Sequence, residues 1–315
     1  MMDRPLADDA GMLPDLRTVT GSEPGPTLTI LAGVHGDELE GVLAARRIAR
    51  ALDRDKLRGT VRVAAPAHPA AWDAGTRVSP LDELNLARVF PGSPDGLPTE
   101  RVAAYLTAKA LAGADMLIDL HSAGESFDMP LLAGFHDGGD EVSTRSSAAA
   151  RAFGAPYLWK HPELSVGRSL SAAEALGIPS IYVEGRGGGQ VRWRDLNCYV
   201  DGVARVMKSL GMVDSAPEGY RSVVVRGDGD TDEGIPAPAT GFYVTAVRVG
   251  DELERGGVIG EILDEDGQST ARIQAPTAGI VMLLRRRSRV QTGEITAIVA
   301  PREAAADDGA ERAGR

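Results

Sequence analysis

Apolar runs of about seven or eight residues alternate with helix-like segments through the first two-thirds of the chain. Four of these runs predict buried strands, at TLTILAGV (27–34), TVRVAAP (60–66), ADMLIDLH (114–121) and PSIYVEG (179–185). Apolar positions at helical spacing predict helices over 38–52, over 99–114 with Thr99 as N-cap, over 169–177 with Ser169 as cap, and over about 194–210. Alternation of this kind is typical of an α/β domain whose sheet is mostly parallel.

The pattern changes after about Pro217. Short β-like runs such as GFYVTAV, GVIGEIL and GIVMLL follow one another, with turn residues between them and no helical spacing. We therefore expect an α/β catalytic domain over residues 1–217 and a smaller all-β domain over residues 218–301. The polar, alanine-rich segment 302–315 is expected to be a disordered tail.

Composition narrows the class of protein. The chain is 43% hydrophobic and 25% charged, as soluble globular proteins are, and its single cysteine excludes a disulfide within the chain. A net charge of -11 argues against nucleic acid as a partner, although local arginines still permit a small anionic substrate. The acidic N-terminus has no signal-like apolar run, and no run is long enough to span a membrane, so a cytoplasmic protein is expected.

Three titratable residues fall at the ends of predicted strands: His35, His121 and Glu184. In an open α/β sheet, groups at the carboxyl ends of parallel strands meet at one edge. Glu38 lies close enough to His35 to reach the same ion from a glycine-rich turn, and two imidazoles with one carboxylate match a catalytic zinc site. Asp119 is expected either to orient the His121 side chain without binding the metal itself, or to pair with another residue. Taken singly, HGDE also fits an ordinary polar loop.

Four motifs in order are GVHGDELEG (33–41), NLARVFPG (85–92), DLHSAG (119–124) and GIPSIYVEGRGGG (177–189). Together they resemble the succinylglutamate desuccinylase/aspartoacylase family, a group of zinc carboxypeptidase-like hydrolases, from about residue 26 to about residue 300. The resemblance implies that His35, Glu38 and His121 hold one Zn²⁺ per subunit and that Glu184 is the catalytic carboxylate. It also implies hydrolysis of the amide bond of a small N-acyl amino acid or a related metabolite.

Substrate contacts are expected from the long polar stretch 68–92. The resemblance puts Arg77 and Arg88 where the family binds a substrate carboxylate and polarises the scissile carbonyl, and Asn85 would add a neutral donor. The alternative is that these arginines pair with nearby acids. Related sequences read NLNR where this chain reads NLAR, so the hydrogen bond of one asparagine side chain is missing at Ala87.

Other titratable groups have weaker expectations. Arg168 and Arg186 flank the predicted site and fit an anion-binding role. His161 is expected at the surface, with the edge of the pocket as the alternative.

Several rival functions are disfavoured. The C-terminal runs look like the hammerhead fold of lipoyl and biotinyl carriers, but no lysine follows Lys208 to bear a cofactor. The chain has no G-x-S-x-G nucleophile motif, and GRGGG lacks the full dinucleotide-binding spacing. We therefore expect a zinc-dependent deacylase, with a zinc carboxypeptidase acting on short peptides as the alternative and homo-oligomer formation left open.

Overall fold

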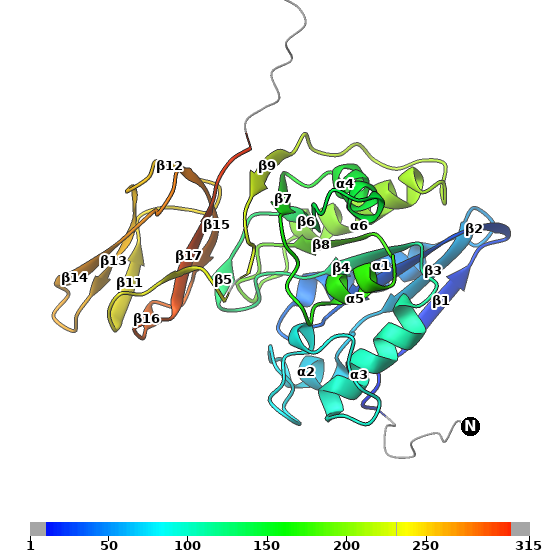
Figure 1. Cartoon of the computed structure of the whole chain (residues 1–315), viewed down its shortest axis with the longest axis horizontal. Helices are drawn as coiled ribbons and strands as arrows, with labels where there is room; N and C mark the ends of the chain where they lie inside the picture. Colours follow the sequence, from blue (N-terminus) through cyan, green and yellow to red (C-terminus); the bar gives the residue numbers. More distant parts are fainter. Residues whose placement is uncertain (1–10, 231, 304–315) are drawn as a thin grey trace, which may run out of the picture.

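The computed structural model describes residues 11–230 and 232–303. Its larger part is an eight-stranded sheet flanked by helices, and its smaller part consists of β-strands alone (Figure 1). Both the α/β class and the smaller all-β region predicted from the sequence are confirmed.

The strands of the large sheet run in the order β1-β3-β2-β4-β8-β6-β7-β9. Their bounds are β1 Leu16–Thr20, β2 Glu23–Ala32, β3 Arg58–Ala64, β4 Met116–Leu120, β6 Leu132–His136, β7 Tyr157–His161, β8 Ser180–Glu184 and β9 Val223–Arg226. All neighbouring pairs are parallel except β1 with β3 and β6 with β8. The sheet is therefore mixed and mostly parallel.

Helices cover both faces of this sheet. One face carries α1 Leu39–Ala51, α4 Glu141–Phe153 and α6 Trp193–Ser209; the other carries α3 Pro98–Leu106, the π-helical turn η2 Thr107–Leu111 and α5 Ser169–Ala175. In β2, Leu28 and Ile30 face the first group while Leu31 faces the second. Central strands are apolar at successive positions because neither face meets water.

Two helix starts differ from the prediction. Pro98 is the first residue of α3, so Thr99 lies inside the helix and its hydroxyl donates to Asp82 instead of capping. Ser169 is likewise the first residue of α5, and its hydroxyl donates to Asp119 on β4. Each polar side chain found a tertiary acceptor in place of the local cap that its position indicated.

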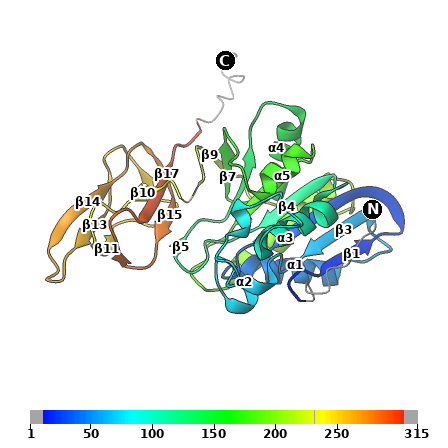
Figure 2. The same cartoon turned by 60° about the horizontal axis from the view of Figure 1, so that its bottom comes forward.

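The second region comprises two antiparallel sheets. One contains β10 Ile235–Pro236, β12 Glu252–Leu253, β15 Gly279–Arg285, β17 Ile295–Ala300 and the short strand β5 Phe127–Asp128; the other contains β11 Gly241–Thr245, β13 Val258–Leu263, β14 Ser269–Gln274 and β16 Arg289–Val290. Because β5 belongs to the α/β part of the chain and pairs with β15, the two regions share a sheet as well as a core cluster (Figure 2).

The boundary between the regions differs from the expected residue 218. Strand β9 pairs in parallel with β7, so residues 223–226 complete the first sheet, and we place the boundary after Arg226. The predicted tail begins with Arg302, which bridges to Val225, and Glu303, whose N–H donates to Val224 O. The rest of that tail lies outside the described residues. Within the described ranges, no helix combines the length and the apolar character that crossing a bilayer requires.

Candidate active site

Three neighbouring strands, β2, β4 and β8, end at the same edge of the sheet. They are parallel to one another, with Leu31 opposite Asp119 and Asp119 opposite Tyr182. His35 follows β2, His121 comes directly after β4, and Glu184 is the last residue of β8. The sequence prediction needed these strands to be parallel neighbours, and they are.

The loop between β2 and α1 brings Glu38 to this edge. Glu38 is the N-cap residue of α1 and is buried. A Cβ at Gly36 would lie 1.9 Å from the carbonyl oxygen of Ala71, and one at Gly41 would lie 2.4 Å from that of Leu120. Only glycine permits these contacts, which press the loop against α2 (Pro69–Ala74) and the start of α1 against the end of β4.

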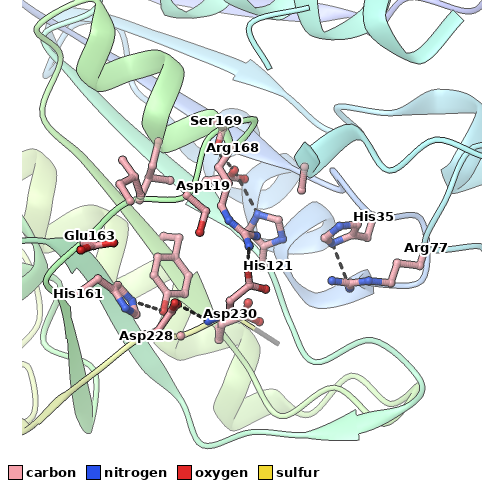
Figure 3. Close-up of a pocket in the computed structure, with 17 residues that line it drawn as sticks. His35, Arg77, Asp119, His121, His161, Glu163, Arg168, Ser169, Asp228 and Asp230 are labelled. Carbon is pink, nitrogen blue, oxygen red and sulfur yellow. Dashed lines mark hydrogen bonds and ion pairs between the residues drawn. The ribbon is translucent and has the colours of Figure 1, made fainter. Parts of the chain in front are cut away.

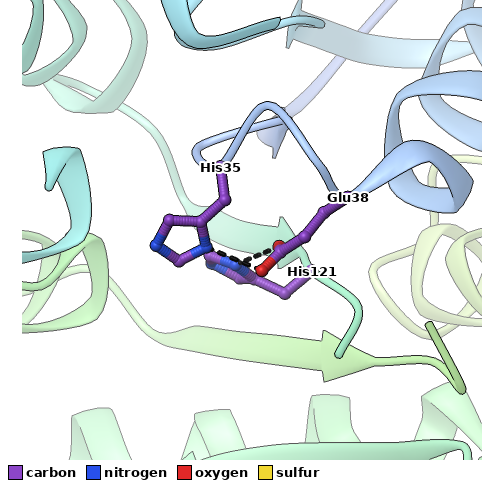
Figure 4. A group of neighbouring side chains, drawn as sticks. All are labelled: His35, Glu38 and His121. Atoms are coloured by element: carbon purple, nitrogen blue, oxygen red, sulfur yellow. Dashed lines mark hydrogen bonds and ion pairs between the residues drawn. The ribbon is translucent and has the colours of Figure 1, made fainter. Parts of the chain in front are cut away.

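His35, Glu38 and His121 form a compact buried cluster (Figure 4). Nδ1 of His35 lies 2.7 Å from one carboxylate oxygen of Glu38, and Nδ1 of His121 lies 2.9 Å from the other. The candidate ligand atoms all lie within 4.8 Å of one another, close enough to bind one metal ion.

The contacts of the two Nε2 atoms, which point away from Glu38, show that this cluster fits a cation. Nε2 of His35 lies 3.0 Å from Oδ1 of Asn85, and Nε2 of His121 lies 3.1 Å from Oδ2 of Asp119. Since both oxygens are acceptors, each Nε2 carries the proton and a neutral ring has its lone pair on Nδ1. Two lone pairs and one carboxylate then converge, which is the donor set of a divalent metal ion.

The electrostatic environment also favours positive charge here. Burial alone would lower the pKa of His121, but the Asp119 and Glu38 carboxylates outweigh burial and hold this pKa well above its usual range. Burial would raise the pKa of Glu38, but His35 and His121 outweigh it and keep the carboxyl ionised. Burial lowers the pKa of His35. The cluster therefore retains an anionic carboxylate that favours a cation.

Glu184 lies beside this cluster. Its Oε2 atom is buried and has no hydrogen-bond partner among the described residues. Burial, assisted by the nearby Glu38 carboxylate, raises the pKa of Glu184 to about 8. A carboxyl group with an unengaged oxygen and a pKa near neutrality suits proton transfer. Arg186, which was expected to fit an anion-binding role, pairs with Asp128 at 3.3 Å.

A cavity of about 110 Å³ extends from the cluster toward the segment that joins β9 to β10, described over residues 227–230 and 232–234, which we call the linker (Figure 3). At its inner end lie His35, Arg77, His121 and Glu184; Figure 3 shows His161, Glu163 and Asp228 on the opposite side. We call these the inner end and the outer end. Arg168, Asp230 and Tyr182 also line the cavity, and we assign them to the outer end because Asp230 follows Asp228 in the linker and pairs with Arg168, while the Tyr182 hydroxyl lies 2.8 Å from Nε2 of His161.

A second cavity adjoins the same inner groups from the side of the β region. It shares Arg77 and Glu184 with the first cavity and also touches Glu38. Its other walls include apolar side chains from both regions of the chain: Ala123, Phe127, Met129, Leu283 and Ile295. Arg77 and Glu184 thus lie where the two cavities meet.

The residues predicted to contact substrate have different positions. Arg77 lines both cavities, and its Nη1 lies 3.1 Å from Oε1 of Glu38 and 3.3 Å from Nδ1 of His35. Asn85 supports His35, and its Oδ1 also accepts a hydrogen bond from the N–H of Ala87. The described residues that line the cavities do not include Asn85 or Arg88, whereas Ala87 lines the first cavity.

Sequence reasoning missed the partner of Arg88. Its guanidinium binds Asp232 at 2.6 Å and approaches Asp230 at 3.6 Å, both in the linker that follows β9. The acidic run DGDTDEG was visible in the sequence, but nothing local indicated which arginine it would meet. The linker therefore forms part of the site.

The expectation that His161 lies at the surface is wrong. The residue is buried between Trp159 and Tyr182, and its ring nitrogens lie 2.9 Å from Gly227 O and 2.8 Å from the Tyr182 hydroxyl. Burial lowers the pKa of His161 to about 4. The local sequence KHPEL carries no sign of this burial, because the covering residues come from β8 and the linker.

Comparison with known proteins gives three related results. Residues 24–210 match the succinylglutamate desuccinylase/aspartoacylase catalytic domain. A relative from Halomonas elongata, N-alpha-acetyl-L-2,4-diaminobutyric acid deacetylase, is 30% identical over 293 residues, which cover 90% of this chain and 84% of that protein. A solved succinylglutamate desuccinylase/aspartoacylase from Rhodobacter sphaeroides is 30% identical, with a TM-score of 0.83 over 92% of this chain and 89% of that one.

A further solved structure is the product-bound Ectoine utilization protein EutE from Ruegeria pomeroyi. It is 28% identical, with a TM-score of 0.85 over 91% of this chain and 88% of that one. The match with the catalytic domain spans more than half of the chain, and these similarities extend through the β region as well. The chain therefore belongs to the succinylglutamate desuccinylase/aspartoacylase family.

Proposed function

We propose that this protein is a single-zinc deacylase that removes the acyl group from a small N-acylated amino acid. In this proposal His35, Glu38 and His121 bind the metal, and Glu184 transfers protons. The chain is a hydrolase that acts on linear amide bonds. The observation that supports a zinc deacylase is the convergence of two Nδ1 lone pairs and the Glu38 carboxylate beside an unengaged oxygen of Glu184.

The choice of zinc rests on the donor set. Two imidazoles and one carboxylate leave a fourth position of a tetrahedral ion open, as in catalytic zinc sites. When bound, zinc would lower the pKa of a water molecule toward neutrality and stabilise negative charge on the substrate carbonyl oxygen. Asn85 and Asp119 hold the two rings in the tautomer that such an ion requires.

Glu184 moves the proton. It accepts a proton from the attacking water as the water oxygen bonds to the amide carbon. It then gives this proton to the amide nitrogen as the carbon–nitrogen bond breaks, which leaves an amine and a carboxylic acid; the acid passes its remaining proton to the amine or to water and becomes a carboxylate. A pKa raised to about 8 by burial makes the protonated form accessible at neutral pH, as the second step requires.

We assign different parts of the substrate to the two cavities. Arg77 and Glu184 line both cavities, so the scissile bond lies at their junction, with the Arg77 guanidinium positioned to stabilise the developing oxyanion. The acyl group takes the second cavity, whose apolar walls include Phe127, Met129 and Leu283. The amino-acid part extends toward the outer end. Arg88 and Asn85 remain predicted substrate contacts, although neither is among the described residues that line the two cavities.

The decisive experiment combines metal analysis with a substrate panel. Metal-loaded protein is assayed on N-acetyl and N-succinyl amino acids and on short peptides, beside chelated protein. Glu184→Gln should keep one metal ion per chain and lose turnover by at least about a thousandfold, because general acid–base catalysis is removed. Retained turnover in that variant contradicts the role of Glu184, and faster cleavage of peptides than of N-acyl amino acids favours the carboxypeptidase alternative.

A further inference from the structure

The linker between the two regions contributes acidic side chains to the outer end of the cavity. Asp228 and Asp230 both line it, and they follow directly after β9. The Asp230 carboxylate lies 2.6 Å from Nη2 of Arg168 and 3.6 Å from Nη2 of Arg88. Asp230 therefore bridges two arginines that come from different parts of the catalytic region.

These contacts hold both arginines against carboxylates of the linker, so a substrate carboxylate would have to compete with Asp230 and Asp232 for them. Arg168 is the cation at the outer end, and its partner Asp230 is mostly buried. Arg88 is held a second time by Asp232, at 2.6 Å from Nη2 and 3.2 Å from Nε. Arg88 was expected to bind a substrate carboxylate, and in this structure that substrate group would have to displace Asp230 and Asp232 from the guanidinium.

The net charge of the outer end is negative. Its walls hold one guanidinium, that of Arg168, against the three carboxylates of Glu163, Asp228 and Asp230. Asp119 adds a separate observation, because it lines the same cavity, is 1% exposed, and has an Oδ1 atom with no hydrogen-bond partner among the described residues. A hydrogen-bond donor on a bound ligand would satisfy that atom.

We propose that Asp230 is a specificity-determining residue: by holding Arg168 and Arg88, it makes the outer end favour substrates whose amino-acid part carries a second ammonium group and disfavour those with a second carboxylate. The proposal rests on the deacylase function proposed above and names its substrate class, the N-acylated diamino acids. A second substrate carboxylate would meet the like charges of Glu163, Asp228 and Asp230, of which Asp230 is the least exposed, whereas an ammonium group would gain a carboxylate partner.

The test compares two substrates of opposite charge on the full-length, metal-loaded protein. These are N-α-acetyl-L-2,4-diaminobutyrate and N-acetyl-L-aspartate, and the quantity measured is the ratio of their kcat/KM values. Asp230→Asn keeps the shape of the side chain but removes its charge, which frees Arg168. The ratio should fall by at least about tenfold in favour of the aspartate substrate.

Two further variants separate selectivity from structure. Asp230→Glu retains the carboxylate and should keep most of the wild-type ratio. Asp266→Asn makes the same change in net charge at an exposed turn of the β region and should leave the ratio unaltered. If Asp230→Asn lowers only the melting temperature and the ratio stays within about twofold, Asp230 merely ties the linker down and the proposal is overturned.

A binding measurement keeps the inference independent of turnover. Calorimetric titration of each variant with L-2,4-diaminobutyrate and with L-aspartate should show the same change of preference. If the wild-type protein hydrolyses neither acylated substrate, the deacylase proposal fails, but the binding preference still decides the role of Asp230. Should Asp230→Asn fail to fold, Asp232→Asn frees Arg88 from a more exposed partner and should shift the preference in the same direction, by less.

Discussion

The inner and outer ends of the cavity are built in different ways. At the inner end, His35, His121 and Glu184 sit at or just beyond the ends of adjacent parallel strands, and backbone hydrogen bonds of the sheet hold them. At the outer end, Glu163, Asp228 and Asp230 lie on loops, and ion pairs hold the linker. The contrast indicates that reaction chemistry is placed on the rigid sheet, while selectivity is left to segments that tolerate change.

The largest expected effect breaks the inner end. Glu38→Gln removes the one anionic ligand between two imidazoles, so metal affinity should fall further than the roughly 10- to 100-fold loss typical of a group that only supports a ligand. Turnover should fall with metal content. Metal analysis after dialysis, together with kcat at saturating zinc, measures both quantities.

Two controls isolate the ligand role of Glu38. Glu184→Gln should lose turnover while retaining metal. Glu174 lies on α5 and pairs with His136, away from the cluster, so Glu174→Gln should retain both turnover and metal. Full metal content in Glu38→Gln would refute the proposed metal site.

A smaller loss of zinc affinity is expected from residues that hydrogen-bond the proposed metal ligands without binding the metal. Asp119→Asn keeps an oxygen near Nε2 of His121 but removes the charge that makes the ring a stronger donor, so zinc affinity should fall by about 10- to 100-fold. Competition with a chromophoric chelator measures this affinity. Ser169→Ala removes only the hydroxyl that donates to the same carboxylate, and its effect should be smaller. Equal losses in the two variants would mean that Asp119 acts through packing.

The last prediction concerns stability at the outer end and leaves the chemistry of the inner end unchanged. His161 has a pKa of about 4 in the folded protein and an ordinary value of 6.5, so the unfolded chain binds its proton first as pH falls. Stability is therefore lost as pH falls from about 6.5 to about 4, by about 3 kcal/mol in total. His161→Gln should flatten this slope in urea unfolding at a series of pH values. An unchanged slope would show that His161 is already charged in the folded protein.

The sequence predicted the inner end better than the outer end for a local reason. His35 and Glu38 are three residues apart, and His121 and Glu184 each end an apolar run, so these groups meet at one edge once the strands are parallel neighbours; the family resemblance supplied their roles. Such positions depend on short segments whose conformation is set by nearby residues. The same reasoning could not separate Asn85, which supports His35, from a residue that contacts substrate.

Contacts between distant segments were beyond prediction. Arg88 and Asp232 are 144 residues apart, and Arg168 and Asp230 are 62 apart, so only the path of the linker in the folded protein decides that they pair. His161 likewise became a buried, neutral residue because Tyr182 and Gly227 close over it. No pattern within either segment specifies such a partner.

By itself, the sequence determined the α/β sheet, the β-rich C-terminal region and the set of groups at the strand ends, since each follows from the spacing of apolar residues and from glycines that permit close turns. Only the tertiary structure decided which charges remain available to a ligand. A charge is neutralised by whatever lies within a few ångströms in space, and distance along the chain does not determine that separation.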